Sequence, residues 1–121
     1  MVCNGEIYNY LELKKELFDR GARFKTNSDT EVIIKAYLVW GPACVDRFEG
    51  MWAFALLDER NSQILLSRDR FGEKPLYHAF WDKTLYFASE VKMLASLSGQ
   101  NPTVNRDQIR RYLVNGYRAL Y

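Results

Sequence analysis

Apolar positions early in the chain recur with the period of an amphipathic helix facing a core. This stripe consists of Tyr10, Leu13 and Leu17. The spacing predicts a helix over residues 10–20, with Asn9 as its cap and Glu12 as the reciprocal partner in a capping box. Gly21 follows as the stop signal. A helix of this kind needs a sheet or another helix to cover its apolar face.

A second helical pattern follows a short polar stretch. Ser28 and Glu31 have the spacing of another capping box, and Gly41 with Pro42 ends the pattern. The apolar residues between these signals are Val32, Ile33, Ala36, Tyr37 and Trp40. We therefore expect a second amphipathic helix that packs on the same core.

The middle of the chain changes to strand-like patterns. Residues 51–58 are apolar at both alternating sets of positions, which is typical of a central strand covered on both faces. Residues 63–67 return as a second strand. Residues 76–80 and 84–88 predict a hairpin that turns at residues 81–83.

Two more helices are predicted near the end of the chain. Ser89 can cap a helix that continues through Leu97, and Asn105 can cap another over residues 106–115, which Gly116 closes. The expected class is α+β with antiparallel pairing and helices on a face. The absence of repeats and linkers indicates one continuous unit. Its first residues read as a strand that leads into a turn, so we expect sheet and helix layers to be missing upstream.

Composition excludes several classes of protein. A chain of 121 residues that is 48% hydrophobic can form a packed core, and a net charge of +2 without a basic stripe indicates no nucleic-acid partner. Cys3 and Cys44 have no metal-site spacing, so no metal site or disulfide framework is expected. No apolar run is long enough to span a membrane, and no signal segment opens the chain. We expect a cytoplasmic protein without a membrane partner.

A polar cluster near the start of the chain is the first candidate for chemistry. Asn4 offers a side-chain amide and Gly5 offers a backbone N–H that no Cβ obstructs, which together could stabilise an oxyanion. Glu6 adds a carboxylate for a cationic group. The alternative interpretation is that Asn-Gly-Glu is simply a turn.

A second candidate lies where the second helix begins. Asp29 can cap that helix and interact with the positive end of its dipole. Asp29 and Glu6 each lie at a junction between a loop and a helix, so the two carboxylates could together bind a substrate ammonium group. Their spacing alone does not establish that they converge.

Five ordered blocks cover almost the whole chain. They are NGEIYN at residues 4–9, TNSDTEV at 26–32, FEGMWAFA at 48–55, SRDRFGEKPLY at 67–77 and FASEVK at 87–92. Together they resemble the class II glutamine amidotransferase domain of asparagine synthetases. The resemblance implies an N-terminal-nucleophile hydrolase with an αββα sandwich, of which this chain would form a part. The doubly apolar strand at residues 51–58 agrees with that architecture.

The resemblance also implies a reaction and its residues. In that family an N-terminal cysteine attacks the side-chain amide of L-glutamine, its own α-amino group acts as base, and ammonia passes through a tunnel to a synthetase domain. That domain activates aspartate with ATP and magnesium. By matching motif, Asn4 and Gly5 would form the oxyanion hole, while Glu6 and Asp29 would bind the α-amino group of glutamine.

The chain departs from the family pattern at the nucleophile. The expected Cys-Gly-Ile opening is absent, as is the upstream arginine segment that binds the glutamine carboxylate in relatives. Cys3 directly precedes Asn4 and is no substitute, so we interpret it as a small buried thiol. We therefore expect no nucleophile, no cofactor in this chain, and no glutamine hydrolysis by the chain alone.

The resulting hypothesis is a fragment of an asparagine synthetase. Residues 1–98 would be the central and C-terminal part of the amidotransferase domain, and residues 99–121 a linker and helix leading towards the missing synthetase domain, with a homodimer left open. One alternative is a non-catalytic interaction module that completes its fold with a partner chain. Another is an amidotransferase of a polysaccharide cluster with a different acceptor.

Several other polar residues are assigned structural roles. His78, the only histidine, is interpreted as a packed residue of a strand. Residues 89–92 are assigned to packing. For Arg68, Asp69 and Lys74 we favour a salt-bridged loop at the domain edge, and they stay outside the catalytic set.

Overall fold

The computed structural model describes residues 1–100 and 103–116 of the chain. Residues 101–102 and 117–121, to which part of the predicted linker belongs, lie outside the described residues. In chain order the elements are β1 (Val2–Ile7), α1 (Tyr10–Asp19), α2 (Asp29–Trp40), the 3-10 helix η1 (Gly41–Arg47), β2 (Gly50–Asp58), β3 (Gln63–Arg68), β4 (Tyr77–Trp81), β5 (Thr84–Ala88), α3 (Val91–Ser98) and α4 (Arg106–Asn115).

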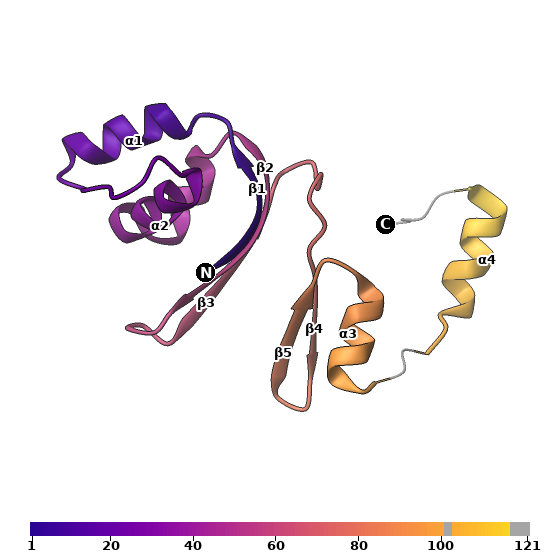
Figure 1. Cartoon of the computed structure of the whole chain (residues 1–121). Helices are drawn as coiled ribbons and strands as arrows, with labels where there is room; N and C mark the ends of the chain where they lie inside the picture. Colours follow the sequence, from indigo (N-terminus) through magenta and orange to yellow (C-terminus); the bar gives the residue numbers. More distant parts are fainter. Residues whose placement is uncertain (101–102, 117–121) are drawn as a thin grey trace.

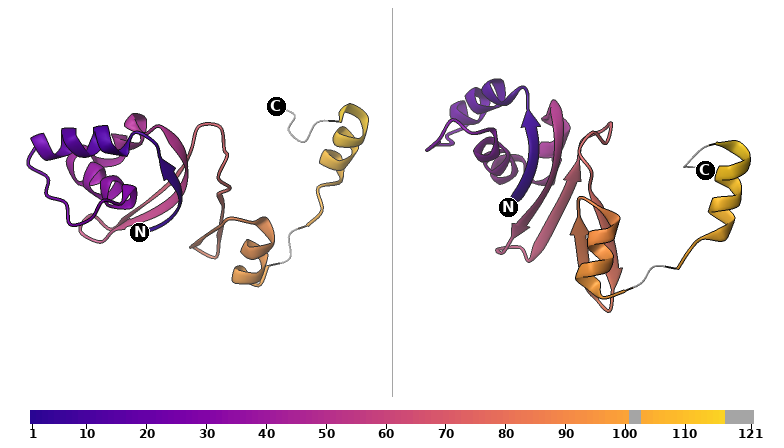
Figure 2. Two further views of the ribbon diagram at one scale, coloured as in Figure 1. Left: turned by 45° about the horizontal axis from the view of Figure 1, so that its top comes forward. Right: turned by 45° about the vertical axis from the view of Figure 1, so that its right-hand side comes forward.

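These elements stack in layers. Strands β1, β2 and β3 form an antiparallel sheet in that order, and β4 pairs with β5 in an antiparallel hairpin. Helices α1 and α2 cover one face of the three-stranded sheet, the hairpin lies on its other side, and α3 packs on the hairpin (Figures 1 and 2). Helix α4 lies apart from these layers (Figure 1). The predicted α+β class with antiparallel sheets is confirmed.

The position of β2 between two layers explains why its sequence is apolar on both faces. Trp52, Phe54 and Leu56 join the core under the helices, whereas Ala53 and Ala55 lie on the opposite face towards the hairpin, and all five are buried. Burying a large apolar side chain contributes about 1.5–3 kcal/mol. The cluster of buried residues comprises Ile7, Leu13, Leu17, Val32, Ile33, Ala36, Tyr37, Cys44, Phe48, Trp52, Phe54 and Leu56.

The helices lie close to where the apolar spacing predicts them, but some caps differ. Ser28 accepts a hydrogen bond from the N–H of Thr30 at 3.1 Å, as a cap should. Asn9 makes no capping bond with its side chain. Instead it donates to the carbonyl of Arg47 at 2.9 Å and accepts from the N–H of Glu49 at 3.0 Å. The predicted capping box at Asn9 is wrong because these tertiary partners occupy its amide.

Of the two other predicted N-caps, one is present in the structure and one is not. Asn105 accepts from the N–H of Gln108 at 3.0 Å and caps α4, and Gly116 closes that helix with a left-handed conformation. Ser89 is not the cap of α3, because that helix begins at Val91 and Glu90 precedes it as the N-cap residue without a side-chain bond. The hairpin turns through Asp82 and Lys83, both with positive φ angles.

The Asn4-Gly5-Glu6 segment lies inside strand β1, so the interpretation of these residues as a turn is wrong. Gly5 pairs with Trp52 of β2 and has a φ of 149°. A Cβ at Gly5 would overlap the carbonyl of Met51 and the Cα of Trp52. The glycine is therefore required by the close approach of two backbones and not by a change of chain direction.

The loop between β3 and β4 is organised by one buried carboxylate. Asp69 accepts hydrogen bonds from the N–H groups of Phe71, Glu73 and Lys74 at 2.9–3.1 Å. Burial acts to raise the pKa of Asp69, but the N–H groups of Lys74 and Glu73 outweigh it and hold that pKa below its usual value.

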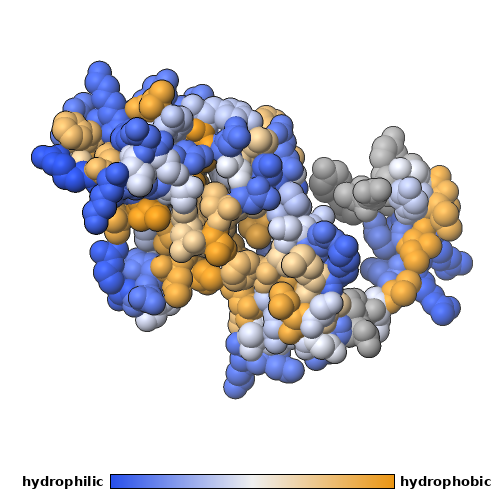
Figure 3. All heavy atoms as spheres, in the orientation of Figure 1, coloured by the Kyte–Doolittle hydropathy of each residue, from blue (hydrophilic) through white to orange (hydrophobic). Residues whose placement is uncertain are grey.

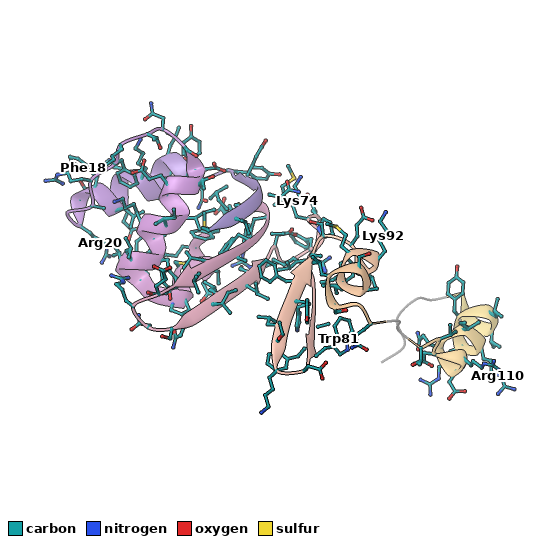
Figure 4. All side chains as sticks on the ribbon, turned by 60° about the horizontal axis from the view of Figure 1, so that its bottom comes forward. Phe18, Arg20, Lys74, Trp81, Lys92 and Arg110 are labelled. Carbon is teal, nitrogen blue, oxygen red and sulfur yellow. The ribbon has the colours of Figure 1, made fainter. Side chains whose placement is uncertain are left out.

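Two arginines also bind the backbone of this region. Arg68 donates to the carbonyl of Gly72 at 2.7 Å, and Arg70 donates to the carbonyls of Phe48 and Asp46. Among the described residues, the ion pairs involve none of Arg68, Asp69 and Lys74. The predicted salt-bridged loop is thus wrong, because backbone groups supply the partners. Figure 4 shows Lys74 where the chain passes from the three-stranded sheet to the hairpin.

Apolar side chains also remain on the surface. They gather where the three-stranded sheet and the hairpin meet, and they form a stripe along α4 (Figure 3). The exposed large apolar side chains of the described residues include Leu57, Ile64, Phe80, Leu113 and Val114. None of the helices within residues 1–100 and 103–116 combines the length and hydrophobicity that a membrane crossing needs.

Candidate functional site

A cavity of about 470 Å³ lies where β1 ends and α2 begins. Two acidic residues line it, Glu6 from β1 and Asp29 from the first turn of α2. The remaining lining residues are Ile7, Tyr8, Tyr10, Asn27 and Ser28. The structure therefore brings together two carboxylates that lie 23 positions apart in the chain.

Asp29 connects the helix to the strand. Its Oδ1 accepts from the N–H of Thr30 at 2.7 Å, and its Oδ2 accepts from the N–H of Ile7 at 3.1 Å. The hydroxyls of Ser28 and Thr30 also donate to Oδ1, each at 3.5 Å. Oδ2 accepts only from Ile7 among the described residues, and a carboxylate oxygen has about two acceptor positions, so Oδ2 has capacity for a further donor. Asp29 is half-buried and Glu6 is exposed. The pair can attract a cation that enters from solvent.

The loop before Asp29 is bound by the carboxylate of Glu31. Glu31 accepts from the N–H groups of Lys25 and Thr26 and from the hydroxyl of Thr26, at 2.6–3.2 Å. The bond from the Thr26 hydroxyl is the first cause that lowers the pKa of Glu31 to about 2, followed by the N–H of Lys25. The predicted reciprocal bond from Glu31 to Ser28 is not formed, since the N–H of Ser28 donates to Thr26 Oγ1.

Acidification is expected to weaken this loop. Because folding lowers the pKa of Glu31 from about 4.5 to about 2, its contribution to stability is complete above about 4.5 and is lost as the pH falls from there to about 2. The charge of Lys35 also acts to lower the pKa of Glu31. Urea unfolding of the natural chain and of Glu31→Gln, from about pH 6 to about pH 2, should show two free energies that converge in acid. A constant difference across this range would contradict the assignment.

Asn4 lines a second cavity, of about 260 Å³, between the three-stranded sheet and the hairpin. It pairs with Ala53 of β2, so both side chains lie on the sheet face towards the hairpin. Other lining residues include Cys3, Ala55, Phe87, Ser89 and Met93. Asn4 therefore does not line the same cavity as Glu6 and Asp29.

Gly5 lies between these two cavities on β1. Strand β1 is at the edge of the sheet, and the N–H of Ile7 points away from β2, because Asp29 accepts it. In a regular antiparallel pair, alternate residues direct their N–H groups to the same side. The N–H of Gly5 is thus placed on the open edge of β1, next to the acidic cavity.

Cys3 is exposed, so its interpretation as a buried thiol is wrong. Partial burial is the main cause that raises the pKa of Cys3, and the negative charge of Asp29 raises it further. A raised pKa keeps the thiol protonated, which is the opposite of an activated nucleophile. His78 is also exposed on β4, so the prediction that it is packed is wrong too.

Sequence reasoning overlooked several residues of the acidic cavity. Tyr8 lines it from the turn after β1 and Tyr10 from the start of α1, while Asn27 and Ser28 line it from the loop before α2. The sequence predicted Ser28 as a helix cap, but the spacing of residues gave no indication that this cap lies next to Glu6. Within the described residues, no group of three His, Cys, Asp or Glu side chains could hold a metal ion.

Comparison with known proteins identifies the family. Residues 1–120 match the glutamine amidotransferase domain family. A putative asparagine synthetase 2 (glutamine-hydrolyzing) of Methanocaldococcus jannaschii is 42% identical over 120 residues, which cover 97% of this chain and 22% of the relative. Asparagine synthetase 2 (glutamine-hydrolyzing) of Bacillus subtilis is 46% identical over 96 residues, which cover 79% of this chain and 13% of the relative.

A third relative gives the same result. A putative asparagine synthetase (glutamine-hydrolyzing) of Mycobacterium tuberculosis is 40% identical over 121 residues, which cover 97% of this chain and 19% of the relative. The chain spans between 13% and 22% of the length of these three relatives. The match to the family model extends over nearly every residue, and the chain belongs to the glutamine amidotransferase domain family.

Proposed function

We propose that this chain forms the glutamine-binding part of a glutamine-hydrolysing asparagine synthetase. In this proposal Glu6 and Asp29 bind the α-ammonium group of L-glutamine. The observation that carries the proposal is the cavity of about 470 Å³ that both carboxylates line. Two carboxylates next to one ammonium group allow short charge-assisted hydrogen bonds, which are stronger than neutral ones.

The oxyanion hole is assigned to Asn4 and Gly5. When a thiolate attacks the carbonyl carbon of the glutamine side chain, that oxygen becomes negatively charged. The side-chain amide of Asn4 and the N–H of Gly5 on the open edge of β1 would donate to this oxygen. The tetrahedral intermediate then releases ammonia and leaves a thioester, which water hydrolyses to glutamate.

The nucleophile of this reaction would be an N-terminal cysteine. The Cys-Gly-Ile motif does not occur within these 121 residues, so we propose that they bind glutamine without hydrolysing it. In the complete protein, ammonia would pass to a synthetase domain that uses ATP and magnesium to amidate aspartate. The relatives are named as asparagine synthetases, which favours this acceptor over that of a polysaccharide amidotransferase.

The charge of Asp29 is expected to determine which ligand binds. Asp29→Asn should weaken the binding of L-glutamine about tenfold or more, because a neutral amide replaces the partner of the ammonium group. The affinity for 4-carbamoylbutanoate, which lacks the α-amino group, should stay the same. Titration calorimetry with both ligands measures the two affinities.

Two further variants serve as controls. Asp19→Asn removes an exposed carboxylate at the end of α1 and should change neither affinity. Asn4→Ala should leave glutamine binding nearly unchanged, since its amide acts on the transition state. Equal weakening of both ligands by Asp29→Asn, or no binding of L-glutamine by the natural chain, would contradict the proposal.

A further inference from the structure

We propose that Glu31 and Lys14 are positioning residues for Asp29. They bind the loop of residues 25–28 from two sides, and this loop determines where the first turn of α2 meets β1. The inference deepens the proposed function, since it assigns the selectivity for the α-amino group to contacts outside the acidic cavity. Neither Glu31 nor Lys14 lines that cavity.

Glu31 binds the loop from the helix that follows it. Its carboxylate accepts from three donors on two successive residues, the N–H of Lys25, the N–H of Thr26 and the hydroxyl of Thr26. The Thr26 hydroxyl also accepts from the N–H of Ser28 at 3.2 Å. These bonds satisfy backbone donors that belong to no helix or strand, and so restrict the loop to one conformation.

Lys14 binds the same loop from α1. The loop runs back along α1 towards the start of α2 (Figure 1). The ammonium group of Lys14 donates to the carbonyl of Thr26 at 2.8 Å and to Oδ1 of Asn27 at 2.7 Å. It also lies 5.2 Å from the centre of the Phe24 ring. Asn27 in turn lines the acidic cavity, so the hydrogen bond between Lys14 and Asn27 connects α1 to the wall of that cavity.

The position of Asp29 follows from these contacts. Ser28, which the Thr26 hydroxyl binds, is the residue that caps α2 at Thr30. Asp29 comes next and bonds to the N–H of Ile7 on β1. A loop released from Glu31 would allow the helix start to move relative to β1, and the Asp29 carboxylate would leave the place where Glu6 can share a ligand with it.

Hydrogen exchange at Ile7 tests this directly, because its N–H is the donor to Asp29. In Glu31→Gln and in Lys14→Met, we expect this amide to exchange about tenfold faster or more, while the core amide of Phe54 keeps its rate. The preference for L-glutamine over 4-carbamoylbutanoate should fall about fivefold or more in the same variants. Lys14→Arg keeps donors at this position and should restore both properties.

Matched controls come from the same helix. Glu12→Gln and Lys15→Met remove exposed charges of α1 and should leave the exchange of Ile7 unchanged. Exchange at Ile7 that matches these controls in both test variants would overturn the inference, as would faster exchange shared equally by Phe54. If the natural chain shows no preference for L-glutamine, the proposed function fails, and the exchange of Ile7 still decides whether Glu31 and Lys14 position Asp29.

Discussion

Gly5→Ala is expected to lower the free energy of unfolding by about 2 to 6 kcal/mol, the sum of backbone strain of about 1–3 kcal/mol and overpacking of about 1–3 kcal/mol. The strain arises because Gly5 has a φ of 149°, which residues with a Cβ rarely adopt. The overpacking arises because the new methyl group would overlap backbone atoms of Met51 and Trp52. Strand β2 lies between β1 and β3, so it has little freedom to move away.

Urea unfolding of the purified variants measures this effect, with Gly21→Ala as the matched control. Gly21 also has a positive φ, of 92°, but a Cβ there would meet no atom within 4 Å. Gly21→Ala should therefore lower the free energy of unfolding by about 1 kcal/mol or slightly more, from backbone strain alone. Equal losses at the two positions would show that the close approach of β1 and β2 contributes nothing.

Asp69→Ala is expected to destabilise the chain by about 3 kcal/mol or more, because each hydrogen bond that an N–H group donates to a charged acceptor contributes about 1.5–3 kcal/mol. Three such groups, on Phe71, Glu73 and Lys74, would lose their partner together. Asp69→Asn retains one acceptor oxygen and should cost less. The loss should appear as a lower urea midpoint and as shifted amide resonances of these three residues.

The pH dependence of Asp69 has a defined sign. Folding lowers its pKa, so its contribution to stability is present above the usual pKa of an aspartate and is lost as the pH falls through the lowered value. Asp19→Ala, at an exposed position, should stay within about 0.5 kcal/mol at every pH. If Asp69→Ala were equally mild, water would have to replace the carboxylate at all three N–H groups.

The sequence predicts those features that depend on local periodicity. The apolar stripes of α1 and α2 and the two-sided character of β2 each correspond to a buried face in the structure. Asn-Gly is a turn signal, and only the pairing of β1 with β2 places it inside a strand. Asn9 was a reasonable cap by local rules, yet its partners lie 38 and 40 positions away. Such contacts leave no periodic signal in the sequence.

In the candidate site too, the residues could be proposed from the sequence, but their arrangement could not. Glu6 and Asp29 could be proposed from the family resemblance, but their approach depends on where α2 packs against β1, which spacing does not encode. Asn4 and Glu6 lie two positions apart on β1, so alternation alone would place both side chains on one face. That they line different cavities depends on the course of β1 and on what packs beside each end of it. The roles of Asp69 and Glu31 as acceptors of several N–H groups depend on loop conformations that side-chain patterns do not specify.

The unequal sides of β2 have a consequence for the cavity beside Asn4. Trp52, Phe54 and Leu56 belong to the core beneath the helices, whereas Ala53 and Ala55 present methyl groups to the cavity on the hairpin side. Where Ala53 and Ala55 line that cavity, the wall consists of the smallest side chain available to an L-amino acid. Larger side chains at Ala53 or Ala55 would reduce the volume of this cavity stepwise, without a change in Asn4 or in the core beneath the helices. The volume offered to a ligand and the packing of that core can therefore be changed separately.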